Sequence, residues 1–158
     1  MSRFEHTLRI NLTSAYTLTH LCTPALRDSG GSIVNVSSAL SWMVDKNFSS
    51  YAAAKAGMNQ MTKVMSYELS PGVRVNAVAP GAIETPSMEY ITSNPKRKAE
   101  AERWIPLQRL GQPRDIALGV LYLASPASEF VSGKILEIDG GMQAIPGTAI
   151  QEIIAKKQ

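Results

Sequence analysis

Cysteine is almost absent from this 158-residue chain, which contains only Cys22. A lone cysteine excludes a disulfide framework or a cysteine metal site within one chain. The two histidines, His6 and His20, have no carboxylate cluster beside them, so the sequence suggests no metal site. No apolar stretch approaches the roughly 20 residues of a membrane span, and no signal peptide is recognisable. We therefore expect a cytoplasmic protein.

An excess of charge of one sign is also absent. The chain has 16 basic and 13 acidic residues, which gives a net charge of only +3. This is too small to indicate a nucleic-acid partner, and the basic clusters at 96–98 and 156–157 are interpreted as solvated faces. The hydrophobic fraction of 44% is typical of a globular α/β protein. We expect a small-molecule partner rather than nucleic acid or a membrane.

A glycine-rich phosphate-binding turn is the third absence. Neither Gly-x-x-x-Gly-x-Gly nor Gly-x-Gly-x-x-Gly occurs anywhere in the sequence. Such turns let the backbone approach a pyrophosphate at the N-terminus of a helix. The sequence therefore contains no recognisable binding site for the phosphates of a dinucleotide.

What is present is an alternation of helical and extended patterns. Short β-branched runs predict strands at 31–37, 73–79 and 134–138, which we expect to be parallel neighbours in that order. Between them, amphipathic patterns predict helices at 4–27, 50–69, 94–103 and 113–124. We expect Ser49 or Ser50 to cap the second helix. In the first helix, we expect one side to carry Leu8, Leu12, Ala15, Leu18 and Thr19.

Tyr51 and Lys55 are the most informative pair, because residues four apart on a helix share one face. An ammonium group beside a phenol favours the charged phenol and lowers its pKa from the usual value of about 10. That would make the tyrosine a usable general acid or base near neutral pH. Taken alone, this short spacing also fits an ordinary half-exposed helix.

Ser38 lies thirteen residues before Tyr51, just past the end of the strand predicted at 31–37. Open α/β sheets bind their ligands at the carboxyl ends of strands. A hydroxyl group here could face a ligand, or could simply bond to its own backbone.

These motifs belong to six blocks that occur in order along the chain. The blocks are Ile-Asn-Leu (10–12), Gly-Ser-Ile-Val-Asn-Val-Ser-Ser (31–38), Tyr-Ala-Ala-Ala-Lys (51–55), Val-Arg-Val-Asn-Ala-Val-Ala-Pro-Gly (73–81), Leu-Gly-Gln-Pro-Arg-Asp-Ile-Ala (110–117) and Val-Ser-Gly-Lys-Ile-Leu-Glu-Ile-Asp-Gly-Gly (131–141). Together they resemble the C-terminal portion of the short-chain dehydrogenase/reductase family, especially bacterial hydroxysteroid and glucose-dehydrogenase-like members. The resemblance covers residues 1–142, whereas the tail 143–158 shows no family pattern.

The resemblance implies an α/β fold, namely the C-terminal part of a doubly wound parallel Rossmann-type sheet whose N-terminal nucleotide-binding strands are missing. Residues 1–158 would then form a single partial domain, the catalytic half of a dehydrogenase. It also implies a homo-oligomer, a dimer or tetramer, with subunit contacts through the helices at 4–27 and 50–69. The implied reaction transfers a hydride between NAD or NADP and a secondary alcohol or ketone.

Four catalytic positions are implied by the resemblance. Tyr51 matches the tyrosine that exchanges a proton with the substrate oxygen, and Lys55 matches the lysine that assists it and bonds the nicotinamide ribose. Ser38 matches the serine that steadies the substrate oxygen. Asn11 matches an asparagine that holds a water in a proton relay, although an asparagine on a helix is otherwise unremarkable.

The nicotinamide end of the cofactor is expected to meet the end of the second strand. Pro80 fixes a turn there, and Gly81 lets the backbone approach the ring. By resemblance, the amide of Ile83 meets the carboxamide, and the hydroxyl of Thr85 reaches the carboxamide or a phosphate. Thr85 could equally be a simple turn residue before Pro86.

Apolar residues of the long segment 81–112 and of 39–48 are expected to contact a hydrophobic substrate. These are Trp42, Met43, Phe48, Met88, Tyr90, Ile91, Trp104 and Ile105. The residues that select NAD or NADP do not occur in this sequence. An alternative interpretation remains, in which the chain is a catalytically incompetent truncated remnant that acts only through subunit association.

Overall fold

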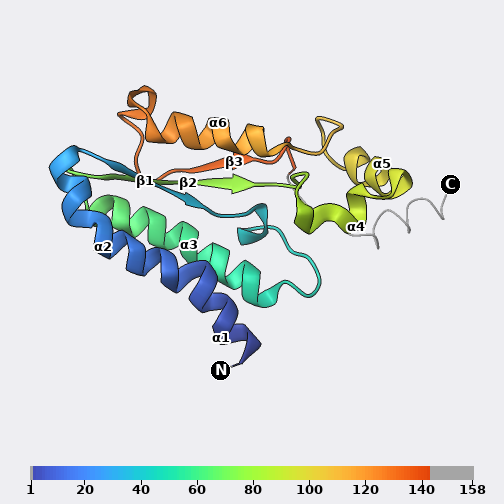
Figure 1. Ribbon diagram of the computed structural model, residues 1–158, viewed down its shortest axis with the longest axis horizontal. Helices are drawn as coiled ribbons and strands as arrows, with labels where there is room; N and C mark the ends of the chain where they lie inside the picture. Colours follow the sequence, from blue (N-terminus) through green and yellow to red (C-terminus); the bar gives the residue numbers. More distant parts are fainter. Residues whose placement is uncertain (1, 143–158) are drawn as a thin grey trace.

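The computed structural model describes residues 2–142 and contains a three-stranded parallel sheet with helices on both faces (Figure 1). The strands are β1 (Ser32–Val36), β2 (Arg74–Pro80) and β3 (Ile135–Ile138), in the order β1-β2-β3. Both strand pairs are parallel. The predicted strands and their order are therefore confirmed, whereas the tail 143–158 lies outside the described residues.

The central strand β2 forms the middle of the core. Val75, Ala77, Val78 and Ala79 are completely buried in it. Helix α6 (Pro113–Ala124) covers one face of the sheet, and α2 (Ser14–Ser29) and α3 (Ser49–Glu68) lie on the other (Figure 1). A strand covered on both faces needs the continuous apolar pattern by which β2 was predicted.

The predicted helix 4–27 is interrupted. It consists of α1 (Arg3–Leu8), a π turn (Arg9–Thr13) and α2 (Ser14–Ser29). Thr19 is buried but Leu18 is 60% exposed, so the prediction that these two residues share one side of the helix is wrong. Adjacent helix residues point about 100° apart, and here Thr19 faces the core while Leu18 lies outside the buried stripe.

Helix α3 runs from Ser49 to Glu68, close to the predicted 50–69. The predicted serine cap is wrong, because the residue before the helix is Phe48 and its side chain makes no capping hydrogen bond. Ser49 already has helical geometry. The buried side of α3 contributes Met65 to an apolar cluster with Leu69, Val73 and Val75.

Two short helices follow β2 in the long segment 81–112, namely α4 (Glu89–Thr92) and α5 (Pro95–Arg103). The prediction of a helix at 94–103 is confirmed. Asn94 caps α5 by accepting hydrogen bonds from the amides of Lys96 and Arg97. Both helices extend beyond the carboxyl end of the sheet (Figure 1).

Candidate active site

A cleft of about 700 Å³ opens where β1 and β2 end. Seven of the eight residues predicted for the site line it: Ser38, Tyr51, Lys55, Pro80, Gly81, Ile83 and Thr85. They come from three separate parts of the sequence, namely the end of β1, the first turns of α3 and the loop after β2. The parallel sheet brings them together because the carboxyl ends of parallel strands share one edge.

Tyr51 and Lys55 occupy one face of α3, as their spacing predicted. The Lys55 Nζ atom lies 5.5 Å from the centre of the Tyr51 ring. It donates a hydrogen bond of 2.8 Å to the carbonyl oxygen of Val36 at the end of β1. Lys55 is only 8% exposed, and this burial lowers the pKa of its ammonium group. The Tyr51 hydroxyl makes no hydrogen bond with residues 2–142, so its proton is available to a ligand.

Ser38 lies at the turn from β1 into a 3₁₀ turn, Ala39–Ser41. Its Oγ accepts a hydrogen bond of 3.2 Å from the amide of Leu40. The local backbone bond that we considered as an alternative is therefore present. The hydroxyl group only accepts in that bond, and it retains its own proton for a second partner.

Asn11 is the one predicted site residue that does not line the cleft. It lies in the π turn, half-buried, and its Nδ2 atom donates to the carbonyl of Thr7 at 3.1 Å. In the same turn, the carbonyl of Ile10 accepts a hydrogen bond from the Ser14 hydroxyl. π turns occur often at functional sites. The role predicted for Asn11 stays a prediction.

Gly81 is required by packing between strands as well as by any ligand. Its amide donates to the carbonyl of Ile138 at 3.0 Å. A Cβ atom at this position would lie 2.7 Å from the Cα of Asp139. The sequence indicated a close approach of backbone to cofactor, and the structure adds a close approach of β2 to β3.

The loop that carries Ile83 and Thr85 is held by the segment before α6. The amide of Glu84 donates to the carbonyl of Gly111 at 2.8 Å, and the amide of Gly111 donates to the carbonyl of Ala82 at 2.9 Å. The Thr85 hydroxyl lies 2.8 Å from the Ser87 hydroxyl. These bonds orient residues 82–85 along the edge of the cleft.

Glu84 ties three elements together, which the sequence did not indicate. Its carboxylate accepts hydrogen bonds from Lys98 of α5 at 2.8 Å and from Gln112 at the start of α6 at 2.7 Å. The hydrogen bond from Lys98 has the largest effect and that from Gln112 the next largest, and both hold the pKa of Glu84 below its ordinary value. An acidic residue beside Ile83 was visible in the sequence, but its partners lie 14 and 28 residues away.

The apolar residues predicted to contact substrate divide into three groups. Phe48 and Met88 line the cleft. The expectation is wrong for Met43 and Ile105, which are 5% and 3% exposed and belong to the core. The others do not line the cleft: Trp42, Tyr90, Ile91 and Trp104. Apolar residues in a loop can pack inward as readily as face a ligand, and sequence alone does not separate the two cases.

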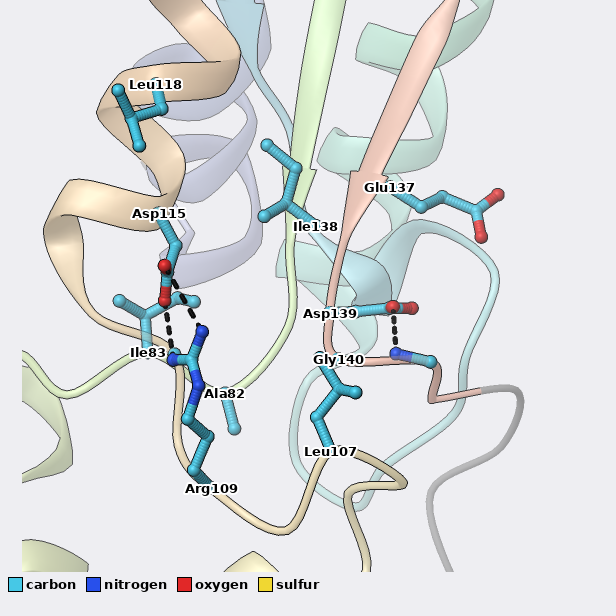
Figure 2. A pocket seen from close by; sticks show the side chains of 12 residues that line it. Ala82, Ile83, Leu107, Arg109, Asp115, Leu118, Glu137, Ile138, Asp139 and Gly140 are labelled. Carbon is cyan, nitrogen blue, oxygen red and sulfur yellow. Dashed lines mark hydrogen bonds and ion pairs between the residues drawn. The ribbon is translucent and has the colours of Figure 1, made fainter.

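A second cavity, of about 360 Å³, lies between the end of β3 and α6 (Figure 2). Arg109 and Asp115 form an ion pair at its edge, with an Nη1–Oδ2 distance of 2.7 Å. The Asp139 side chain accepts a bond from the amide of Gly141 at 2.9 Å, and its other oxygen is buried without a partner among residues 2–142. This cavity shares only Ile83 with the cleft.

Two negative findings apply to the described residues. Within residues 2–142, no group of three or more histidine, cysteine, aspartate or glutamate side chains is arranged to hold a metal ion. In the same range, no helix is both long and apolar enough to cross a membrane.

Similarity to known proteins agrees with this arrangement. The family model described as enoyl-(acyl carrier protein) reductase matches residues 1–143. The uncharacterised oxidoreductase MT0954 of Mycobacterium tuberculosis is 42% identical over 134 residues, covering 84% of this chain and 51% of that protein. The chain spans about half the length of the curated relatives that it matches.

Solved structures give the same result. A 7α-hydroxysteroid dehydrogenase in complex with NADH and 7-oxo glycochenodeoxycholic acid matches with a TM-score of 0.82 and 35% identity, covering 88% of this chain and 55% of the other. A gluconate 5-dehydrogenase from Burkholderia cenocepacia, in complex with NADP and tartrate, matches with a TM-score of 0.81 and 27% identity, covering 88% and 55%. Because its sequence, its parallel sheet and its relatives all agree, the chain belongs to the short-chain dehydrogenase/reductase family.

Proposed function

We propose that this chain is the catalytic half of an NAD- or NADP-dependent oxidoreductase that interconverts a secondary alcohol and a ketone. The observation that carries the proposal is the cleft itself. Ser38, Tyr51 and Lys55 line it together with the end of β2. A proton-transfer group, a cation and an additional hydroxyl group are the components that carbonyl reduction requires.

Tyr51 is assigned the proton transfer. Its hydroxyl group has no partner among residues 2–142 and faces a cleft in which a substrate oxygen could accept its proton. When bound, the nicotinamide cofactor supplies or accepts the hydride. In the direction of reduction, Tyr51 gives its proton to the carbonyl oxygen as the hydride reaches the carbonyl carbon, and in oxidation both transfers reverse.

Lys55 is assigned two tasks. Its positive charge near the Tyr51 ring stabilises the phenolate that remains when the proton leaves. An ammonium group has three donors, and the bond to Val36 uses one. The remaining donors could hold the hydroxyl groups of the nicotinamide ribose.

Ser38 and Asn11 are assigned supporting roles. The Ser38 hydroxyl keeps a proton that it could donate to the substrate oxygen, which stabilises negative charge developing there. Asn11, in the π turn, would hold a water molecule through which a new proton reaches the Tyr51 phenolate.

The cofactor is assigned to the end of β2. The backbone of Pro80, Gly81 and Ile83 and the hydroxyl of Thr85 line the cleft, and they fit the polar carboxamide of a nicotinamide ring. Similar structures hold NADH in one case and NADP in another, so both nucleotides belong in the test.

The substrate is proposed to be a small hydrophobic alcohol or ketone. Val36, Leu40, Phe48, Met88 and Ile116 give the cleft a mainly apolar lining. The similar 7α-hydroxysteroid dehydrogenase, solved with a bile acid, makes a steroid a reasonable first probe. We further propose a cytoplasmic location, since a lone cysteine needs no oxidising compartment. We also propose a homo-oligomer, as the family resemblance implies.

One observation favours the alternative, a remnant that acts only through subunit association. Several apolar side chains of α2 and α3 are exposed, for example Leu21 at 72% and Tyr67 at 87%. Exposed apolar faces of this kind mark association surfaces. Under this alternative, no polypeptide that carries the chain has dehydrogenase activity.

Turnover of the longest natural polypeptide that contains residues 1–158 tests the proposal. We expect it to oxidise secondary alcohols with NAD or NADP, and Tyr51→Phe to lower kcat by at least about 100-fold, since the proton donor is lost. Tyr67→Phe is the matched control, because it removes an exposed hydroxyl from the same helix and should leave kcat unchanged. A Tyr51→Phe variant with more than a few per cent of wild-type turnover would refute the assignment, and an inactive wild type would favour the remnant.

A further inference from the structure

Three polar side chains of α3 follow one another by one turn and face β1: Lys55, Asn59 and Thr62. Lys55 bonds the carbonyl of Val36, and Thr62 accepts a buried hydrogen bond of 2.9 Å from Asn35. Asn59, between these two, is the least conspicuous in the sequence. It connects α3 to the segment that carries Ser38.

The hydrogen bonds around Asn59 fix the orientation of its side-chain amide. The Ser41 hydroxyl has a single proton and donates it to the carbonyl oxygen of Ser38 at 2.6 Å. Its oxygen must therefore accept the bond of 2.7 Å from Asn59 Nδ2. Asn59 Oδ1 then faces Ser37, whose hydroxyl donates to it at 2.5 Å. Only this orientation of the amide places Nδ2 against the Ser41 oxygen and Oδ1 against the Ser37 hydroxyl.

This arrangement holds Ser38 from both sides. The residue before it, Ser37, is 2% exposed and is bonded directly to Asn59. The carbonyl of Ser38 accepts a hydrogen bond from the Ser41 hydroxyl, which in turn accepts one from the same Asn59 amide. Asn59 lies two helical turns beyond Tyr51, on the same face of α3. The amide thus links the serine and the tyrosine of the cleft through a short, rigid path.

We propose that Asn59 is a positioning residue, which fixes the Ser38 hydroxyl relative to Tyr51 by bonding both Ser37 and Ser41. This inference rests on the proposed function, because it concerns the geometry of that reaction. Productive reaction needs atoms to lie within about 3 to 3.5 Å of one another, and a displacement of about 1 Å can cost about 100-fold in rate. Asn59 touches neither substrate nor cofactor in this account.

The test compares Asn59→Leu with Thr62→Val. Leucine has the branched shape of asparagine without its hydrogen bonds, and valine has that of threonine without its hydroxyl group. Asn59→Leu removes two hydrogen bonds to the segment that follows β1, whereas Thr62→Val removes one hydrogen bond to β1 itself, so only Asn59 holds the segment around Ser38. Thr62→Val is therefore a control for a merely structural effect.

Hydrogen exchange of the 158-residue chain gives the first measurement. The amides of Ser41, Trp42 and Met43 are bonded to carbonyls within the turn, at 3.0, 3.2 and 2.9 Å. We expect Asn59→Leu to accelerate their exchange about tenfold, through the loss of two side-chain hydrogen bonds. Thr62→Val should leave it unchanged. Unchanged exchange in Asn59→Leu would overturn the inference whatever the activity.

Kinetics of the longest natural polypeptide give the second measurement. We expect Asn59→Leu to lower kcat about 100-fold, with the KM for the nucleotide altered by less than about twofold and the midpoint of the pH profile unmoved. Ser41→Ala removes the bond to the Ser38 carbonyl and the bond from Asn59 Nδ2, and it keeps the bond between Ser37 and Asn59. It should lower kcat in the same direction and serves if Asn59→Leu does not fold. An active wild type with unimpaired Asn59→Leu and Ser41→Ala would overturn the positioning role alone, whereas an inactive wild type would overturn the proposed function and this role with it.

Discussion

The two ends of β2 use polar groups in opposite ways. At the amino end, Asn76 is fully buried, donates to the carbonyl of Val131 at 2.8 Å and accepts from the amide of Lys134 at 2.9 Å. The guanidinium group of Arg74 donates to four oxygens, which belong to Leu123, Ser125, Ser128 and Val131. These polar groups have partners within the chain itself.

At the carboxyl end, donors remain available. The Tyr51 hydroxyl has no partner among residues 2–142, Ser38 keeps its proton, and Lys55 uses one of three donors. The comparison teaches that the polar groups at the amino end of β2 are used within the fold, whereas those at the carboxyl end keep donors free for the ligand that we propose.

The largest effect on stability is expected at the amino end. Arg74→Met removes a charged donor and leaves four acceptors without it, so we expect the free energy of unfolding to fall by about 3 kcal/mol. Urea denaturation measures the change. Arg114→Met, an exposed substitution on α6, is the matched control and should change stability little. A loss no greater than in this control would mean that the two ends of β2 do not differ as described.

A smaller effect, which depends on pH, is expected at the carboxyl end. Lys55→Met removes one hydrogen bond but also a buried charge, so we expect stability at pH 7 to change by less than about 1 kcal/mol. Burial lowers the pKa of Lys55 from 10.5, so above the folded-state pKa the folded chain binds fewer protons than the unfolded chain. The stability of the wild type relative to Lys55→Met should therefore rise with pH up to about 10.5.

Urea denaturation across this pH range measures the difference between wild type and Lys55→Met. Lys63→Met, on the exposed side of α3, is the control and should give a difference that does not vary with pH. If the wild type lost stability relative to Lys55→Met as the pH rose, the buried ammonium group would not carry the cost assigned to it.

The smallest effect is expected at the edge of the second cavity. The hydrogen bond from Arg109 has the largest effect and that from the amide of Gln112 the next largest, and both hold the pKa of Asp115 below its ordinary value of 3.8. Asp115 therefore stabilises the fold above that pH, and the contribution disappears as the pH falls through its folded-state pKa. Asp115→Asn should slightly lower the Tm at pH 7 and not at low pH. Glu100→Gln is the exposed control, and a difference that persists in acid would contradict this account.

Much of the fold could be predicted from the sequence because its signals are local. The runs around Val34, Val75 and Leu136 predicted three strands correctly, since continuous apolar residues are typical of strands covered on both faces. Pro113 marked the start of α6 because proline is favoured in the first helical turn. Seven cleft residues were found from their position at strand ends and from their family resemblance.

What the sequence did not show depends on contacts between distant residues. Asn59 meets Ser37 and Ser41 from about 20 residues away, and Glu84 meets Lys98 across a loop. Neither pairing produces a periodic pattern of residues in the sequence. Similarly, nothing local separates Met43, which packs into the core, from Phe48, which faces the cleft.

The π turn at Arg9–Thr13 affects how the first helix can change in length during evolution. In a regular helix, adding or removing one residue rotates everything on one side of the change by about 100°. A π turn accommodates one additional residue locally, so the side chains before and after it keep their alignment. A related chain could therefore lack one residue between Arg9 and Thr13 and still pack α1 and α2 against α3 as this chain does. The loss of a single residue at this turn would therefore leave a regular helix whose two ends keep their packing.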